Sequence, residues 1–189
     1  MLKFYDIDEN YIQFLKTIDR QVPDVKYDSN NKFLCGVVLE INRVKYYAPI
    51  SHKTDKQQTN LQIFDNGVPI STIRFSFMIP AFDEVLTYKN FKDIAKIDPA
   101  YASLLHAEHS YCSNNVTDIK AKALSVYKIG CNKNHRLNYT CCDFKKLEEH
   151  YMEYKTNKRH QLRCLFYYYS SILKITTTLI TMPLLLNFL

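Results

Sequence analysis

The sequence predicts a single α+β domain, because strand-like segments fill its first half and helix-like segments its second. Residues 33–79 contain apolar, β-branched runs and alternating apolar positions, whereas from Asp98 onward apolar residues recur every three or four positions. At 189 residues, 47% of them hydrophobic, the chain is long enough to bury one core. We therefore expect one compact domain in which an antiparallel sheet comes first and most helices follow.

The first segments are a helix and a β-hairpin. Asp8 can cap a helix that ends before Pro23, and its apolar face carries Tyr11, Leu15, Ile18 and Val22. Residues 33–41 are mostly apolar and β-branched, which predicts a buried strand. Asn42-Arg43 connects this strand tightly to residues 44–48, so the two strands form a hairpin.

A polar loop at 51–60 separates the hairpin from two further strands. Residues 61–64 are compatible with a short strand, and Asp65-Asn66-Gly67 with a turn. The alternation of apolar side chains then predicts a strand that ends before Pro80, with these residues on its buried face: Ile73, Phe75, Phe77 and Ile79.

Three helices are expected in the second half. Asp98 and Pro99 form a cap followed by an N1 proline, so a helix starts here and runs to about Asn114. Residues 118–128 form the next helix, with Gly130 placed to end it. Asp143 caps the last helix, whose apolar face carries Phe144, Leu147, Tyr151 and Tyr154.

The C-terminal segment differs from the rest, so we divide the chain into a domain at 1–156 and a basic, then apolar, tail at 157–189. Residues 164–189 carry one charge, Lys174, and are long enough to span a bilayer. Lys174, Pro183 and three consecutive threonines weaken that interpretation, so a membrane partner is not expected. The N-terminus has no apolar run of the kind found in signal peptides, so we expect a cytoplasmic protein with reduced thiols.

The composition argues against phosphate-loop and metal chemistry. Three glycines are too few for a Walker or dinucleotide motif. Cys131, His135, Cys141 and Cys142 are close in sequence, but they lack the C-x2-C spacing of structural zinc sites. The acidic residues are scattered, whereas a two-metal nuclease needs several convergent carboxylates. We therefore expect neither a metal nor a cofactor.

The best candidate for catalysis is Ser51-His52-Lys53, where a predicted strand ends in a polar loop. A serine hydroxyl can hold a phosphate, histidine ordinarily titrates near neutral pH, and lysine supplies positive charge. Together they could transfer a proton and stabilise a charged phosphoryl transition state. The alternative is an ordinary solvated loop, since this tripeptide is common by chance.

The chain carries a formal charge of +6, 15 tyrosines and 11 phenylalanines. Cations interleaved with aromatic residues suit single-stranded RNA, whose phosphates are neutralised and whose bases stack. A solvated helix face would give the same pattern in the later part of the chain. The candidate RNA-binding residues are Arg43, Lys45, Tyr46, Tyr47, Lys56, Lys120, Lys122, Lys133 and Arg136.

The order of several segments resembles the ToxN/AbiQ family, the endoribonuclease toxins of type III toxin–antitoxin systems. The matching segments span about residues 2–156, and they are Lys3 to Tyr5, Tyr11-Ile12, Val22-Pro23, Gly36 to Ile41, Lys45 to Ser51, Asn66 to Pro69, Phe77 to Pro80 and Cys142 to Tyr151.

The resemblance implies a strongly twisted antiparallel sheet flanked by helices, similar to small endoribonuclease toxins. It implies metal-independent cleavage of cellular or phage mRNA by the ribose 2′-hydroxyl, which leaves a 2′,3′-cyclic phosphate and a 5′-hydroxyl. It also implies inhibition by a small, repeat-encoded, pseudoknotted antitoxin RNA, which the toxin processes and binds in a closed protein–RNA assembly. The associated biology is phage defence by abortive infection.

The resemblance also implies site residues. Ser51 falls on the family's hydroxyl position, and Lys53 on its lysine, with Lys56 as the alternative. The family often has Thr-Ser-x-Lys here, so this chain is one residue short or has His52 in place of the second hydroxyl. Tyr11 and Tyr27 match tyrosines that help to form the site. We thus expect an RNA-neutralised endoribonuclease; the alternatives are a non-catalytic RNA-binding regulator and a membrane-anchored protein.

Overall fold

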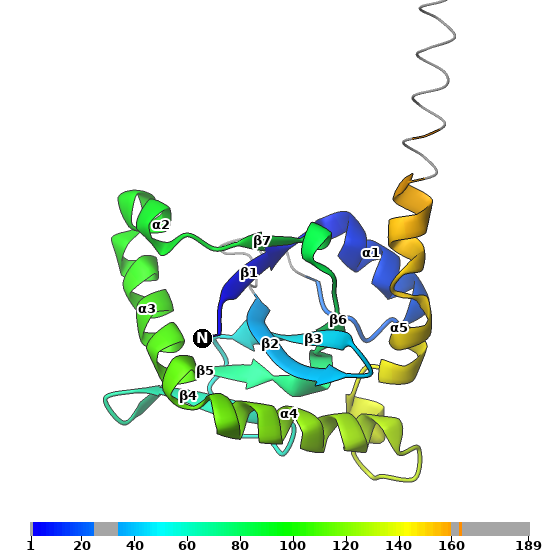
Figure 1. The fold of residues 1–189 in the computed structure, drawn as a ribbon. Coiled ribbons are helices and arrows are strands. Elements are labelled where there is room, and N and C mark those ends of the chain that lie inside the picture. The colour runs from blue at the N-terminus through cyan, green and yellow to red at the C-terminus, as the bar shows by residue number, and fades with distance from the viewer. Residues whose placement is uncertain (1, 25–33, 160–162, 164–189) are drawn as a thin grey trace, which may run out of the picture. The chain divides into compact units, whose positions relative to one another are not determined.

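The computed structural model describes residues 2–24, 34–159 and 163 (Figure 1). Two compact units are present, the first from Met1 to Tyr151 and the second from Met152 to Leu189. The first unit thus ends five residues before the domain boundary expected at 156. In the second unit, residues 153–159 are helical. Among the described residues, no helix combines the length and apolar character needed to cross a membrane.

Seven strands form one sheet in the described part of the chain, and every strand pair is antiparallel (Figure 1). The strand order is β4-β5-β3-β2-β1-β7, and β6 pairs with β3. The strands are β1 (Phe4–Ile7), β2 (Leu34–Ile41), β3 (Val44–Ser51), β4 (Asn60–Asp65), β5 (Val68–Arg74), β6 (Ile79–Pro80) and β7 (Leu86–Tyr88). With the helices described below, this arrangement confirms the predicted α+β class.

Strand β3 holds the sheet together because it pairs along both of its edges. One edge pairs with β2. On the other edge, Tyr46 near the start of β3 lies opposite Pro80 of β6, and Ser51 at its end lies opposite Thr72 of β5. The two ends of β3 therefore lie in different surroundings.

Two tight turns connect neighbouring strands as the sequence predicts. Asn42 and Arg43 join β2 to β3 with φ angles of 51° and 67°. Asn66 and Gly67 join β4 to β5 with φ angles of 48° and 81°. Positive φ at both central residues matches the right-handed twist of antiparallel strands, which explains the Asn-Gly pair.

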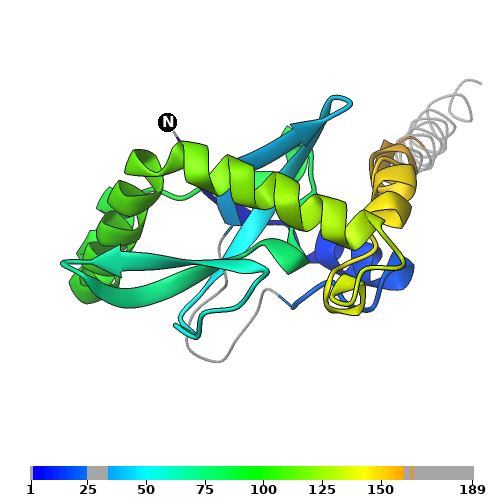
Figure 2. The ribbon, with the colours of Figure 1, turned by 90° about the horizontal axis from the view of Figure 1, so that it is seen from below.

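The helices are α1 (Glu9–Ile18), α2 (Phe91–Ile97), α3 (Pro99–Asn114), α4 (Val116–Cys131) and α5 (Phe144–His150). Helix α3 packs against α2 and β4, α4 runs along β2, and α5 contacts α1 and β6 (Figures 1 and 2). The predicted caps are confirmed, since the carboxylates of Asp8, Asp98 and Asp143 each accept a backbone N–H of the first turn. Helix α2 was not expected from the sequence.

Four expected elements differ from the structure. The last helix, α5, ends at His150, so Tyr151 and Tyr154 do not extend its apolar face. The first helix ends at Ile18 rather than near Pro23, and Val22 is buried beyond its end. The alternating segment 73–79 is not one strand, because β5 stops at Arg74 and a short 3-10 turn, η1 (Phe75–Phe77), precedes β6. The helix expected at 118–128 is longer at both ends and includes Gly130.

Gly130 serves packing and does not end its helix. A Cβ atom at this position would lie 2.5 Å from Cε2 of Phe144, which is fully buried. The absence of a side chain therefore allows the first residue of α5 to pack against α4.

Candidate functional site

The predicted catalytic loop begins where β3 ends. Ser51 lies opposite Thr72 of β5, and its Oγ accepts a hydrogen bond of 3.3 Å from the backbone N–H of Lys53. This is a local serine turn, which fixes the hydroxyl at the end of a rigid strand. As the acceptor of that bond, the hydroxyl can still donate its own hydrogen to a phosphate oxygen.

Side chains of β4 and β5 hold the backbone of this loop. Thr72 Oγ1 donates to the carbonyl of Lys53 at 2.8 Å, and Gln62 Nε2 donates to the carbonyl of Thr54 at 2.8 Å. Asn60 binds the loop twice, since its Nδ2 donates to the Asp55 carbonyl and its Oδ1 accepts from the backbone of Gln57. The polar loop is thus an ordered structure anchored through its own backbone.

The same arrangement leaves the functional side chains of the loop in solvent. His52, Lys53 and Lys56 are exposed, and Ser51 is half-buried. Arg136, from the segment after α4, donates to Gln58 Oε1 at 3.3 Å and so brings a further cation to the loop. A hydroxyl, an imidazole and several cations therefore gather at this end of the sheet, which suits acid–base chemistry on a phosphodiester.

Tyr11 does not lie in this loop region. It is 0% exposed, its hydroxyl donates to the Pro80 carbonyl at 2.8 Å, and its ring packs against Phe82. Pro80 lies opposite Tyr46, five residues along β3 from Ser51, or about 16 Å. The structure thus places Tyr11 in the core and does not bring it to Ser51. Tyr27 lies outside the described residues.

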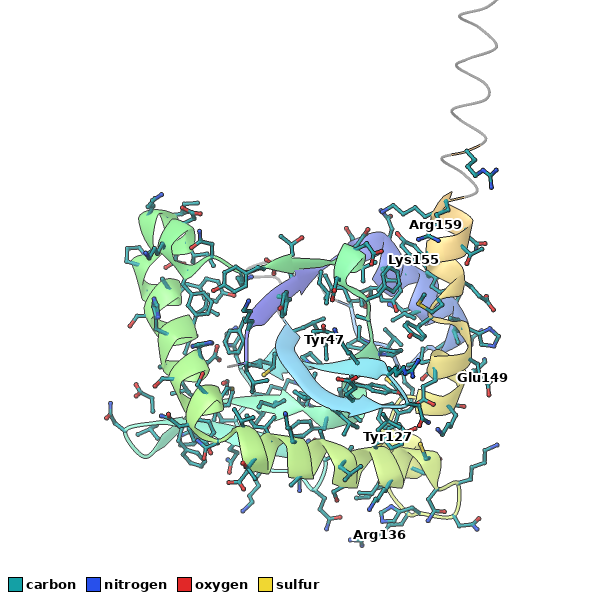
Figure 3. The ribbon with its side chains drawn as sticks, viewed as in Figure 1. Tyr47, Tyr127, Arg136, Glu149, Lys155 and Arg159 are labelled. Atoms are coloured by element: carbon teal, nitrogen blue, oxygen red, sulfur yellow. The ribbon has the colours of Figure 1, made fainter. Side chains whose placement is uncertain are left out.

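Tyr46 and Tyr47 were expected to stack on RNA bases, and this expectation is wrong. Their exposed fractions are 0% and 2%, so neither ring presents a face to solvent. Tyr47 packs edge-on against Tyr5, and burial raises the pKa of its hydroxyl to about 12. Figure 3 labels Tyr47 within the sheet.

Tyr46 belongs to a polar cluster centred on the half-buried Glu148, and the cluster reaches the surface at the exposed Lys145. The Glu148 carboxylate accepts hydrogen bonds from Tyr46 at 2.7 Å, from Tyr127 at 2.6 Å and from Lys145 at 2.9 Å. Burial and the bond to Glu148 raise the pKa of Tyr46 far above its ordinary value. Burial alone would raise the pKa of Glu148, but the three donors outweigh it and lower that pKa. This cluster, which joins β3, α4 and α5, is structural.

The remaining candidate RNA-binding residues are spread over several elements, and Lys56 lies in the loop itself. Arg43 and Lys45 lie at the hairpin end of β3, and Lys45 is six residues, or about 20 Å, from Ser51. Lys120 is exposed and Lys122 half-buried on α4, while Lys133 is exposed after it. Only Arg136 among them has a hydrogen bond to the loop in the described structure. Figure 3 shows it beyond the end of α4.

A pocket of about 520 Å³, which was not expected from the sequence, lies beside the loop. We call it the Arg74 pocket. Its lining comes from the segment after α1, from the loop, from the end of β5 with η1, and from the segment after α4. It consists of Gln21, Gln57, Gln58, Thr59, Arg74, Ser76, Phe77, Leu137, Tyr139 and Thr140. The one signal in the sequence was the group of cations near residues 133–136.

No group of three or more His, Cys, Asp or Glu side chains in the described residues is arranged to hold a metal ion. The cysteines that raised the question differ in exposure. Cys142 is fully buried and Cys131 half-buried, and burial raises the pKa of both thiols.

Comparison with known proteins identifies the relatives of the chain. It is 29% identical to the endoribonuclease ToxN of Bacillus thuringiensis subsp. kurstaki over 163 residues, which cover 81% of this chain and 84% of the relative. It is 27% identical to the endoribonuclease ToxN of Pectobacterium atrosepticum over 166 residues, which cover 81% and 94% of the two chains.

Solved structures agree with this relationship. A bacterial type III toxin–antitoxin protein, studied for selective toxin inhibition by a non-coding RNA pseudoknot, matches with a TM-score of 0.75 and 29% identity. The match covers 82% of this chain and 98% of that one. The lactococcal anti-phage endoribonuclease AbiQ shares the fold, with a TM-score of 0.71 and 24% identity over 82% of this chain and 99% of its own.

The fold and the relatives together define the class, which is the toxin component of a toxin–antitoxin system. The family model described as "Toxin ToxN, type III toxin-antitoxin system" matches residues 3–152. The chain therefore belongs to the ToxN family, as the resemblance of its segments predicted.

Proposed function

We propose that this protein is an endoribonuclease toxin that cleaves single-stranded RNA at the loop of Ser51, His52 and Lys53, without a metal ion. The observation that carries the proposal is the anchored loop at the end of β3. Its backbone is held by Thr72, Gln62 and Asn60, while its hydroxyl, imidazole and ammonium groups remain available to a substrate.

The reaction we propose is attack of the ribose 2′-oxygen on the adjacent phosphorus. His52 or Lys53 takes the proton of the 2′-hydroxyl as the 2′-oxygen bonds to phosphorus. The bond from phosphorus to the 5′-oxygen breaks, that oxygen takes a proton from solvent, and the base returns its proton to solvent. The products are a 2′,3′-cyclic phosphate and a 5′-hydroxyl. Ser51 donates a hydrogen bond to a phosphate oxygen, and where His52 is the base, the Lys53 ammonium stabilises the charge that develops there.

We further propose that a small pseudoknotted antitoxin RNA inhibits the protein in a closed protein–RNA assembly in the cytoplasm. One relative's structure concerns toxin inhibition by a non-coding RNA pseudoknot. Another concerns a processed non-coding RNA that regulates an antiviral system, and it matches with 25% identity and a TM-score of 0.70. By analogy, the toxin acts on cellular or phage mRNA and serves phage defence by abortive infection.

The test is cleavage of an unstructured RNA by the purified full-length protein in excess EDTA. We expect cleavage to continue and the products to carry cyclic-phosphate ends. Loss of cleavage in EDTA with rescue by magnesium would overturn the metal-free route. Intact RNA in a gel-shifted complex would instead identify a non-catalytic RNA-binding protein.

A further inference from the structure

The Arg74 pocket has the composition of a nucleotide site. It joins a cation, two aromatic rings and three glutamine amides in about 520 Å³, which is within the usual size of small-ligand sites. The cation can meet a phosphate, the rings can stack on a base, and the amides can bond to base edges.

Arg74 is the least satisfied side chain of the pocket. Its Nε is buried and has no hydrogen-bond partner among the described residues. Its guanidinium carbon lies 5.4 Å from the centre of the Phe77 ring. A buried donor without a partner destabilises the folded protein, and an anionic or carbonyl group that entered the pocket would remove that cost.

The aromatic wall of the pocket includes an unusually exposed ring. Tyr139 is 75% exposed, while Phe77 is half-buried beside Arg74. An exposed tyrosine ring beside a cation offers a stacking face of the kind that holds unpaired bases. Across the pocket, Gln58 is fixed by its hydrogen bond from Arg136.

The register of the strands places this pocket next to the loop. Thr72, which holds the Lys53 carbonyl, and Arg74 are two residues apart on β5, so their side chains leave the same face of the strand. The separation along the strand is about 7 Å. Residues 57–59 of the loop themselves line the pocket.

We propose that the Arg74 pocket binds one unpaired nucleotide of the RNA substrate, beside the phosphate that is cut, and sets the base preference there. Arg74 binds the phosphate of this nucleotide, Tyr139 stacks on its base, and Gln57 and Gln58 bond to the base edge. This inference rests on the proposed endoribonuclease function and adds to it a specificity site.

The test compares Tyr139→Leu and Arg74→Gln with the wild type, and Tyr88→Leu is the matched control. Tyr88 is also an exposed tyrosine, at 58%, but it lies on β7 at the opposite edge of the sheet. Cleavage of an RNA library randomised around the cut gives the base preference at each position. Binding of 2′-O-methyl oligonucleotides of A, C and U, which cannot be cut, gives an affinity that does not depend on catalysis.

We expect Tyr139→Leu and Arg74→Gln to weaken binding by about 5- to 100-fold and to flatten the preference at one position only. Tyr88→Leu should change neither. Because Tyr139 is so exposed, its variant will fold even if Arg74→Gln does not.

The possible failures are distinguishable. Wild-type preferences and affinities in both variants would overturn the nucleotide pocket and leave the proposed function intact. If the wild type cuts no RNA but binds the uncuttable oligonucleotides, and Tyr139→Leu weakens that binding, the proposed function fails while the pocket is supported.

Discussion

The two ends of strand β3 carry polar groups for opposite purposes. Near its start, Tyr46 is fully buried, and its hydroxyl is bound to Glu148. At its end, Ser51 passes into a loop whose backbone is bound while His52 and Lys53 face solvent. One strand thus supports a closed polar cluster and an open one.

The comparison of the two ends of β3 suggests how structural polar residues differ from candidate functional ones in this fold. A buried hydroxyl or carboxylate must be hydrogen-bonded within the protein, and a cluster that satisfies itself has no capacity left for a ligand. The loop at Ser51 has the reverse arrangement, because its backbone groups are satisfied and its side chains are available. We therefore expect changes at Ser51 to affect activity and changes at Glu148 to affect stability.

The largest expected effect is loss of RNA cleavage in Ser51→Ala or Lys53→Ala. Each removes a group aimed at the transition state, which typically costs about 100- to 1000-fold in rate. Neither side chain is buried, so the free energy of unfolding should differ from that of the wild type by less than about 0.5 kcal/mol. Cleavage kinetics and thermal unfolding test this, with Ser103→Ala and Lys92→Ala, both exposed, as controls.

His52→Ala and Lys56→Ala complete the series. If His52→Ala abolishes cleavage and Lys53→Ala does not, the histidine transfers the proton. If Lys56→Ala has the effect expected of Lys53→Ala, the site lysine is Lys56. Full toxicity of every loop variant at matched expression would show that the active site lies elsewhere.

Next in size is a stability loss in Glu148→Ala, which leaves the hydroxyl of Tyr46 buried without its carboxylate. Because Tyr46 retains a bond of 3.3 Å to the Phe144 carbonyl, we expect a loss of about 1–3 kcal/mol in the free energy of unfolding, with RNA cleavage retained at permissive temperature. The neighbouring Glu149→Ala is the control, since Glu149 is exposed and should change stability by less than about 0.5 kcal/mol. Equal effects of the two variants in denaturant titrations would contradict the structural role of the cluster.

Glu108 of α3 differs from Glu148 because its carboxylate is buried without hydrogen bonds among the described residues. Neither oxygen has a hydrogen-bond partner among the described residues, although Ser71 of β5 lies close to it. Burial raises the pKa of Glu108 from 4.5 to about 7, whereas the pKa of Glu148 is lowered. The contributions of Glu108 and Glu148 to folding stability therefore change with pH in opposite directions.

Between about pH 4.5 and 7, Glu108 ionises in the unfolded chain but stays protonated in the folded one. Its contribution therefore makes the protein less stable as pH rises through this window, by about 1–3 kcal/mol. The contribution of Glu148 is present above pH 4.5 and is lost as pH falls below it. The melting temperature of the wild type should fall as pH rises through this window, and that of Glu108→Gln should not. An equal fall in both proteins would rule out Glu108 as its source.

The smallest expected effect is that of Arg136→Ala on RNA affinity. Arg136 is exposed, and its hydrogen bond within the described residues goes to the Gln58 amide, so its loss should weaken RNA binding a few-fold and leave stability unchanged. The slope of log affinity against log salt should decrease by about one. Filter binding at several salt concentrations measures the affinity and its salt dependence. A wild-type affinity that does not change with salt would contradict phosphate binding altogether.

Local interactions made several features predictable. Helix caps such as Asp98 bond to backbone groups within three residues, and the turn at Asn66 and Gly67 depends on the φ angles of two neighbours. The expectation for 73–79 was wrong because alternating phenylalanines are typical of a strand, whereas Phe75 is buried in a 3-10 turn that contacts α4. The loop at Ser51 was identified from its position after a strand, and its catalytic role stays a prediction.

The sequence by itself determined the α+β class, the capped helix starts, both tight turns and the membership of the ToxN family, because these depend on residues close together or on ordered segments. Only the tertiary structure decided which aromatic and charged residues are available. Tyr46 meets Glu148 across 102 positions, Arg136 meets Gln58 across 78, and Arg74 meets Tyr139 only at the pocket. Burial depends on such distant contacts, so Tyr46, next to Lys45, was predicted from the sequence to bind RNA and lies in the core of the folded chain.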